Sequence, residues 1–402
     1  MIISRSPHTY FVSNAFTKAM DIYNDANRID DYIGAIRQFP NGDFAYEFLQ
    51  HLTATGLSKR RVLKYAMLLR KILRELDITN AGFAEIQGWV AKLNSSNYKL
   101  STKMDYKVVL KKLFQYRKYR RTDAPYPDEV AWIKVHVSER ELEKESRINA
   151  DKVLSPEDVE KVIKSCDNVR DAAMISVLYE GAFRPSELLR MYVGSVSFKQ
   201  EYCVVTTTGK TGQKRLPLVL SYQLLLRWLE VHPFKSNINA PLWCSLDTNH
   251  RGKRLSYKHF NRILKKQFRR AGIATPVWPY LLRHSALTQM ANKLTEPKLS
   301  LYAGWVMGTR MTRKYVHWSG RELDNTILQI HGLGKPEEGK QNESMRMKQC
   351  PRCSQNNPST NTRCSSCGLV LDINTALQVE EELERRLASL EEKVSRLLDK
   401  ST

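Results

Sequence analysis

Four of the seven cysteines form two Cys-x-x-Cys pairs near the C-terminus, Cys350 with Cys353 and Cys364 with Cys367, separated by ten residues. Each pair can aim two thiolates at one ion from a tight turn, and two pairs complete the tetrahedral sulfur environment that zinc prefers. Gly368 follows the second pair, where the turn needs an unhindered backbone. Two disulfides or a redox pair are the alternatives, which an intracellular setting and the lack of a βαβ pattern disfavour. Because four cysteines close the coordination sphere, the spacing predicts a structural zinc ion and not a catalytic one.

Composition narrows the class of partner. The chain has 402 residues, and its 64 Lys and Arg against 42 Asp and Glu give a formal charge of +22. The length predicts two or three domains, and a hydrophobic content of 42% excludes a wholly disordered chain. The sequence has neither a long apolar run nor a secretory signal, so we expect a cytoplasmic protein with no membrane segment. The excess of positive charge favours nucleic acid as the partner.

A basic protein that acts on a phosphodiester needs three kinds of group. Cations must hold the non-bridging oxygens, a nucleophile must attack, and an acid must protonate the leaving oxygen. The sequence has no carboxylate cluster suited to two magnesium ions and no GxxxxGK[ST] phosphate loop. We therefore expect a route without ATP or a catalytic metal, through a side-chain nucleophile.

Four motifs, which occur in a fixed order, resemble those of the tyrosine recombinases, also called phage-type integrases. They are GAFRPSELL around Arg184, GKTGQKRLPL around Lys210, LLRHS around Arg283, and Gly-Trp at Trp305 followed ten residues later by Tyr315. Each motif alone is weak, whereas all four in order on a basic chain are specific. Archaeal members look most similar, through the spacing of the last motif and the appended cysteines.

The resemblance, which covers residues 40–331, implies a role for each motif. Tyr315 would attack the scissile phosphate, form a 3′-phosphotyrosyl bond and release a 5′-hydroxyl. Arg184 and Arg283 would hold the non-bridging oxygens, since a guanidinium donates from a planar fork. Lys210, on the turn of a predicted hairpin, would protonate the leaving 5′ oxygen.

Four other positions of the family pattern have supporting roles, and one of them departs from the residue that is usual in the family. Glu187 is expected to hold the first arginine helix, and Trp305 to pack beside the phosphate or donate to it. The position three before the second arginine is usually His or Lys in the family, but here it is Tyr280, whose phenol, with a reference pKa of about 10, is a poor base at neutral pH. His284 is a supporting candidate for the missing function, and the group that deprotonates Tyr315 stays open.

Two predicted helices, over residues 59–76 and 101–119, combine an apolar face with a strongly basic one. A solvated face is the ordinary alternative for such charge runs. Because these segments contain almost no acids, we interpret the basic faces as phosphate contacts. The candidate DNA-binding residues are Lys59, Arg60, Arg61, Lys64, Lys103, Lys107 and Lys111.

The expected fold is mainly α with a small β-sheet: a helical core-binding domain, a mixed α/β catalytic domain, a four-cysteine zinc ribbon and a short coiled-coil helix. The expected boundaries are 1–35 for an N-terminal extension, 36–137 for the helical DNA-binding domain, 138–150 for a linker, 151–333 for the catalytic domain, 334–347 for a second linker, 348–372 for the zinc ribbon and 373–402 for the last helix. The heptad seam of that helix comprises Leu383, Leu387, Leu390, Val394 and Leu397. A single amphipathic helix packed on its own domain is the alternative.

The resemblance implies a site-specific DNA recombinase or integrase that acts on double-stranded DNA and works as a tetramer on two DNA sites. We expect the protein to be associated with the nucleoid. Two alternatives are a DNA-binding regulator without chemistry and a type IB topoisomerase-like enzyme that relaxes DNA as a monomer. The complete set of Arg184, Lys210, Arg283 and Tyr315 disfavours the first alternative. The heptad helix favours recombination over the second.

Overall fold

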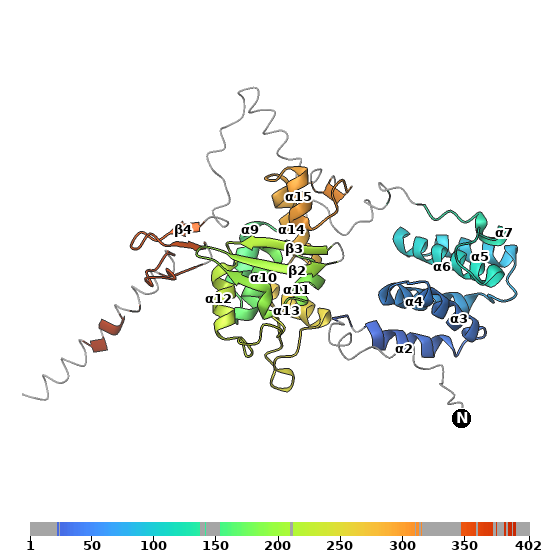
Figure 1. The fold of residues 1–402 in the computed structure, drawn as a ribbon, viewed down its shortest axis with the longest axis horizontal. Coiled ribbons are helices and arrows are strands. Elements are labelled where there is room, and N and C mark those ends of the chain that lie inside the picture. Colours follow the sequence, from blue (N-terminus) through green and yellow to red (C-terminus); the bar gives the residue numbers. More distant parts are fainter. Residues whose placement is uncertain are drawn as a thin grey trace, which may run out of the picture. The chain divides into compact units, whose positions relative to one another are not determined.

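The computed structural model describes residues 22–23, 25–136, 141, 153–209, 212–309, 311–312, 315, 347–358, 361–372, 375, 382, 385–387 and 389–390. The chain divides into two compact units, Met1–Arg147 and Ile148–Thr402. The described part is mainly helical with two small antiparallel sheets, as predicted (Figure 1). None of its helices is both long and apolar enough to cross a membrane.

The first unit packs its helices around one apolar core. They are α2 (Asp25–Ile36), α3 (Gly42–Ala54), α4 (Lys59–Glu75), α5 (Phe83–Ser95), α6 (Leu100–Tyr119) and α7 (Asp128–Ala131). Helix α4 forms because apolar side chains recur three and four residues apart, so that Val62, Leu69 and Ile72 are buried while the basic residues between them face solvent. Phe48 and Phe114 fill the same core from α3 and α6.

Helix α2 lies within the segment that the sequence assigns to an N-terminal extension. It packs against α4, with Ile29 and Ile36 buried. The apolar residues of this helix are sparse and separated by acids, which is why its periodicity is weak in the sequence. The folded helices of the first unit therefore begin before the expected boundary at residue 36. The other expected domain boundaries stay predictions.

The second unit surrounds a central helix, α10, which is buried along almost its whole length. Its helices are α9 (Pro156–Lys164), α10 (Val169–Glu180), α11 (Pro185–Leu189), α12 (Tyr222–Glu230), α13 (Tyr257–Arg270), α14 (Pro279–Ala291) and α15 (Glu296–Ala303). Helices α9, α11, α12 and α14 all contact α10. Ser155 caps α9, and its hydroxyl accepts a hydrogen bond of 3.1 Å from the Asp158 amide, as the Ser-Pro start predicts.

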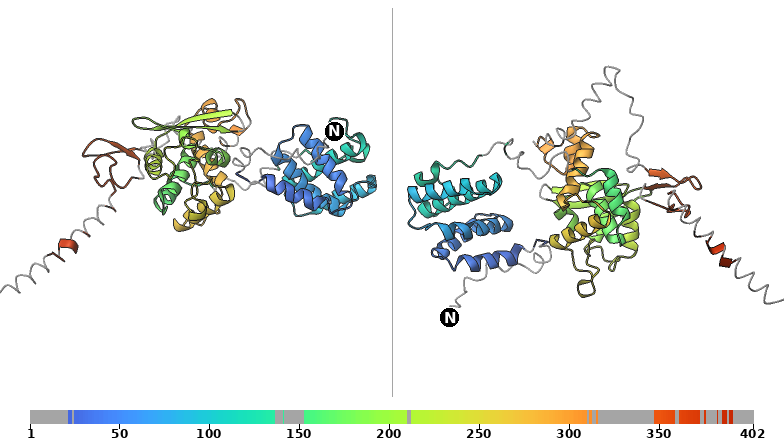
Figure 2. Two further views of the ribbon diagram at one scale, coloured as in Figure 1. Left: turned by 60° about the horizontal axis from the view of Figure 1, so that its bottom comes forward. Right: turned by 180° about the vertical axis from the view of Figure 1, so that it is seen from behind.

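A three-stranded antiparallel sheet lies along one side of these helices (Figure 2). Its strands are β1 (Val196–Phe198), β2 (Cys203–Gly209) and β3 (Gly212–Leu218). The predicted hairpin of β2 and β3 is confirmed, with Gly209 opposite Gly212 and Thr207 opposite Lys214. Gly212, the first residue of β3, has a φ of 105°, a backbone conformation that favours glycine. Strand β2 contacts α11, so the sheet is held next to the first arginine motif.

Two helices of this unit carry the later motifs. Helix α14 begins at Pro279, which occupies the first helical turn. Arg283 and His284 are therefore helical residues. Helix α15 ends at Ala303, and Gly304 caps it with a φ of 66°. Trp305 follows directly after this cap.

The C-terminal part contains a two-stranded sheet of β4 (Met347–Gln349) and β5 (Asn356–Pro358). Two residues of the expected heptad seam, Leu387 and Leu390, are described, and each is 60% exposed. The other seam residues lie outside the described part, so the coiled coil stays a prediction.

Candidate active site and metal centre

The first arginine is fixed by the start of α11. Arg184 is the N-cap residue, and the Glu187 carboxylate accepts hydrogen bonds both from its backbone N–H, at 2.8 Å, and from its Nη1, at 2.5 Å. One carboxylate thus caps the helix and orients the guanidinium. The Nη2 group of Arg184 also donates to the carbonyl of Gly304, at 3.3 Å, which ties the first motif to the last.

The second arginine approaches the same carboxylate from α14. Arg283 is buried, and its Nη1 lies 4.0 Å from Oε2 of Glu187. It donates to the carbonyl of Ala182 and, at 2.8 Å, to the carbonyl of Ala303. Burial and the positive charge of Arg184 lower the pKa of Arg283 to about 10, so the side chain stays charged at neutral pH. Glu187 therefore joins two guanidinium groups that would otherwise repel each other.

Lys214 adds a third cation that the sequence analysis missed. Its side chain is buried under β3, and its Nζ donates to the carbonyl of Gly181 at 2.7 Å. Burial and the charge of Arg283 hold its pKa well below the usual value. The sequence pattern that could have revealed this burial is the alternation of side chains along a strand. It places Lys214 on the same face of β3 as Leu216 and Leu218. Lys210, the predicted acid, lies outside the described residues.

Tyr315 is brought to this cluster, with a side chain only 1% exposed. Its hydroxyl and the Nδ1 atom of His284 are joined by a hydrogen bond of 2.5 Å. Its ring stacks on His284, with centroids 5.7 Å apart, and on Trp305, with centroids 5.3 Å apart. Burial raises the pKa of Tyr315 to about 12, while Arg283 and Arg184 act to lower it.

Tyr280 and Trp305 lie at the edge of the cluster. The Tyr280 ring is half-buried, one helical turn before His284, with their centroids 6.4 Å apart. The Trp305 ring lies 5.9 Å from the Cζ atom of Arg283. The structure thus brings Arg184, Glu187, Arg283, His284, Trp305 and Tyr315 together, with Tyr280 beside His284.

The predicted DNA-binding residues of α4 are on its surface. Lys59, Arg60, Arg61 and Lys64 are exposed, and Lys64 forms an ion pair with Asp105 of α6. The exposed cations follow one another along α4 with few acids between them. Arrays of exposed cations bind DNA phosphates through charge, independently of the DNA sequence.

The prediction for α6 needs a correction. Lys111 is buried, and its ammonium group donates to the carbonyls of Ala131 and Ile133, each at 3.1 Å. It therefore holds the end of α7 and is not placed to contact DNA. Lys103 donates to the carbonyl of Asn94 at 2.7 Å, and Lys107 is half-buried. The sequence of a basic run does not show which of its lysines are buried. The apolar stem of a lysine can pack in a core while its ammonium group binds backbone carbonyls.

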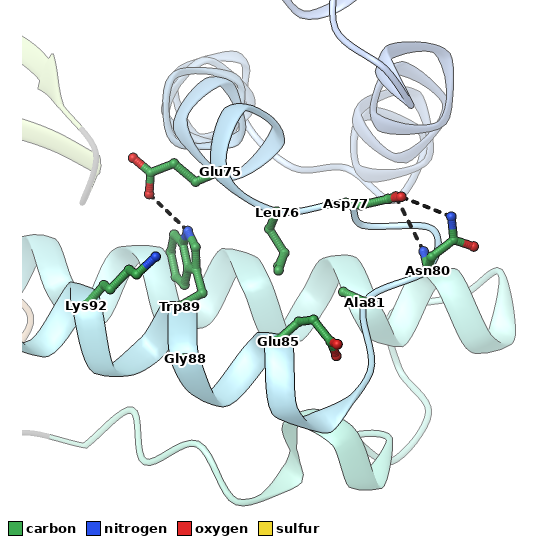
Figure 3. A pocket seen from close by; sticks show the side chains of 9 residues that line it. All are labelled: Glu75, Leu76, Asp77, Asn80, Ala81, Glu85, Gly88, Trp89 and Lys92. Atoms are coloured by element: carbon green, nitrogen blue, oxygen red, sulfur yellow. Dashed lines mark hydrogen bonds between the residues drawn. The ribbon is translucent and has the colours of Figure 1, made fainter.

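A hollow of about 640 Å³ in the first unit has the opposite charge (Figure 3). It is lined by Glu75, Asp77 and Glu85, with Lys92 and the indole of Trp89, which donates to Glu75 at 3.1 Å. Carboxylates repel phosphates, so this part of the unit is unsuited to DNA. The exposed face of α4 is the better candidate.

A second basic surface, which the sequence analysis did not single out, lies on α13. A hollow of about 700 Å³ is lined there by Ser256, Lys258, His259, Asn261, Arg262, Lys265, Lys266 and Arg269. Apolar residues of α13 such as Phe260 and Leu264 are buried, so the intervening cations face outward together. The alternation of apolar and basic residues over 257–270 was the available signal.

The four C-terminal cysteines converge as the spacing predicts. Their sulfur atoms all lie within 4.8 Å of one another. Across the two pairs, Cys350 Sγ is 3.6 Å from Cys367 Sγ, and Cys353 Sγ is 3.5 Å from Cys364 Sγ. Four thiolates bound tetrahedrally to zinc would be about 3.8 Å apart, given Zn–S bonds of about 2.3 Å. The geometry fits a metal ion bound by four cysteine sulfurs.

The two Cys-x-x-Cys turns repeat one backbone pattern. Ser354 and Gly368 stand at equivalent places, with φ values of 57° and 74°. Their amides donate to the carbonyls of Cys350 and Cys364, at 2.8 and 3.0 Å. The buried Asn357 adds support, because its Nδ2 lies 3.5 Å from the sulfur of Cys364. Such outer contacts orient metal ligands.

Comparison with known proteins finds a family that resembles part of the chain. Residues 152–321 match the phage integrase family. This part of the chain, which contains both arginines and Tyr315, is similar to that family, the tyrosine recombinases.

Individual relatives agree with this assignment. The chain is 28% identical to the tyrosine recombinase XerA of Pyrococcus horikoshii over 255 residues, which make up 63% of this chain and 81% of XerA. It is 30% identical to the tyrosine recombinase XerD of Listeria innocua over 189 residues, 45% of this chain and 62% of XerD.

Two solved structures share the fold. The XerH site-specific recombinase in a post-cleavage complex with its palindromic difH substrate matches with a TM-score of 0.54 and 16% identity, over 77% of this chain and 97% of XerH. A lambda integrase tetramer bound to a Holliday junction matches with a TM-score of 0.52 and 14% identity, over 67% and 74% of the two chains.

Proposed function

We propose that this protein is a site-specific DNA recombinase that breaks and rejoins strands through a 3′-phosphotyrosyl intermediate. One observation carries the proposal: the buried hydroxyl of Tyr315 lies among Arg184 of the first arginine motif and Arg283 and His284 of the second. Two cations and a phenol in one site are what metal-free attack on a phosphodiester requires.

Each side chain then has a defined task. Tyr315 Oη attacks the phosphorus and becomes linked to the 3′ phosphate, while the bond from phosphorus to the 5′ oxygen breaks. Arg184 and Arg283 hold the non-bridging oxygens and offset the charge that develops on them. Glu187 keeps the two guanidinium groups in register through its contacts with both.

The leaving oxygen needs a proton, and we assign that task to Lys210 on the β2–β3 turn. Lys214, on β3 of the same hairpin, is a positioning residue. Its bond to the Gly181 carbonyl holds the segment that precedes Arg184. The phosphotyrosyl bond conserves the energy of the broken linkage, so attack by a 5′-hydroxyl reseals DNA without ATP.

The basic faces of α4 and α13 are proposed to contact the DNA backbone. Arg262 and Arg269 on α13 and Lys59 and Arg61 on α4 are exposed. Phosphate contacts of this kind release counterions, so DNA affinity should fall steeply as salt rises.

We further propose that Cys350, Cys353, Cys364 and Cys367 hold a structural zinc ion. When bound, zinc would cross-link the two turns and leave no open position for substrate. The ion takes no part in the cleavage reaction proposed here.

Removal of zinc is therefore expected to leave DNA cleavage intact. Treatment with a chelator should unfold residues near 350–370, because apo four-cysteine turns lose their cross-link. Hydrogen exchange would locate the change, and a covalent-adduct assay would follow activity. Loss of cleavage on chelation, with residues 153–309 still protected, would contradict this separation of roles.

The relaxing enzyme is the second candidate, because it would use the same site. We propose assembly of four subunits on two DNA sites, by likeness of fold to a tetrameric lambda integrase complex. A plasmid that carries two candidate sites from the host element distinguishes the two. A recombinase gives exchanged strands and four-way junctions that require both sites, whereas a relaxing enzyme only changes the linking number of a one-site plasmid.

A further inference from the structure

The proposed function, on which this inference rests, requires that Tyr315 lose a proton as its oxygen attacks phosphorus. The hydroxyl is withdrawn from solvent, since the side chain is only 1% exposed. With a pKa of about 12, the phenol is protonated at neutral pH. The reaction therefore needs a proton acceptor within hydrogen-bond reach.

His284 lies at that position. Its Nδ1 atom is 2.5 Å from the Tyr315 hydroxyl, and the two rings stack with an interplanar angle of 19°. When the neutral imidazole carries its proton on Nε2, the hydroxyl donates to the free Nδ1 lone pair. An imidazole with a reference pKa of about 6.5 is mostly neutral above pH 7, so it can accept the proton.

The neighbouring titratable groups are poorer acceptors. Tyr280, one turn earlier on α14, is a phenol with a reference pKa of about 10 and does not take a proton from another phenol at neutral pH. Arg184 and Arg283 are cations, and both act on Tyr315 by favouring its anion. Glu187 is engaged by Arg184 at 2.5 Å, and Lys214 donates to the Gly181 carbonyl.

We infer that His284 is the catalytic base of this enzyme, in place of the side chain that Tyr280 replaces. In the forward step the Tyr315 proton moves to Nδ1 of His284, Tyr315 Oη bonds to phosphorus, and the 5′ oxygen departs with a proton from the leaving-group acid. In the reverse step the attacking 5′-hydroxyl returns its proton to the leaving-group acid and bonds to phosphorus. The bond from phosphorus to Tyr315 breaks, and the tyrosine oxygen recovers the proton from the His284 imidazolium.

The pH profile of adduct formation separates a base from a merely structural residue. In the wild type the rate should fall as the pH drops through the His284 pKa and level off above it, because only neutral imidazole accepts a proton. In His284→Gln the rate should be lower by about 10²-fold at pH 7.5 and should keep rising with pH. His250→Gln, at an exposed histidine of the same unit, should retain the wild-type profile.

Two further measurements use the leaving group and an added base. A 5′-bridging phosphorothiolate leaves without a proton, so it should rescue Lys210→Ala but not His284→Gln. Imidazole in the buffer should restore adduct formation to His284→Ala in proportion to its neutral concentration. The inference is overturned if His284→Gln keeps the plateau and a rate within threefold of the wild type. It is equally overturned if the phosphorothiolate rescues that variant or imidazole has no effect on His284→Ala. Absence of adduct in the wild type itself would instead refute the proposed function.

Discussion

Replacement of Arg283 by lysine is expected to slow DNA cleavage by about 10²- to 10³-fold, the range found when one preorganised donor to a transition-state oxyanion is lost. A lysine keeps the charge but not the planar fork. It cannot reach the Ala182 and Ala303 carbonyls together and still present a donor to the phosphate. Single-turnover adduct formation on a nicked duplex measures the effect.

The matched control is Arg227→Lys, at an exposed arginine of α12 that has no place in the proposed site. DNA affinity of both variants should stay close to that of the wild type, because most phosphate contacts lie elsewhere. A cleavage rate for Arg283→Lys within threefold of the wild type would show that the fork does not contact the transition state.

Replacement of Glu187 by alanine is expected to lower the stability of the second unit by about 3–5 kcal/mol, the usual cost of removing one partner from a buried ion pair. Arg283 would be left buried without its counter-ion, and Arg184 would lose a capping partner as well. The carboxylate also lies next to Gly209, so it contacts the turn end of the hairpin. Thermal or denaturant unfolding of the full chain would measure the change.

Glu187→Gln and Glu201→Ala serve as comparisons. In Glu187→Gln the amide keeps the shape of the side chain and can still accept hydrogen bonds. This variant should therefore lose less stability than Glu187→Ala. Glu201 is exposed between β1 and β2, and its removal should shift the free energy of unfolding by less than about 0.5 kcal/mol. Equal stability of Glu187→Ala and the wild type would mean that Glu187 does not join the two arginines.

Much of this site was predictable because it depends on local sequence. Arg184 and Glu187 are three residues apart at a helix start, where a capping box forces them together. The cysteine pairs are also local in sequence. Ser354 and Gly368 adopt the same positive-φ conformation after their pairs, so each Cys-x-x-Cys spacing specifies the same turn.

Other features depend on long-range packing, which a single sequence does not reveal. The burial of Lys111 and of Lys214 requires carbonyls supplied by other segments, and both residues look like ordinary surface cations in a basic run. The contact between His284 and Tyr315 joins residues 31 positions apart. The start of α2 was missed because its few buried residues give a weak period.

The central claim is that Tyr315 becomes covalently linked to DNA without metal, and one trapping experiment tests it directly. Wild type and Tyr315→Phe would be incubated with a nicked suicide substrate that carries candidate sites, in the presence of a chelator, and separated on a denaturing gel. We predict an adduct in the wild type whose modified peptide contains Tyr315, no adduct in the variant, and equal DNA binding by both. An adduct that persists in Tyr315→Phe, or a wild-type protein that binds the substrate tightly and forms none, would contradict the account.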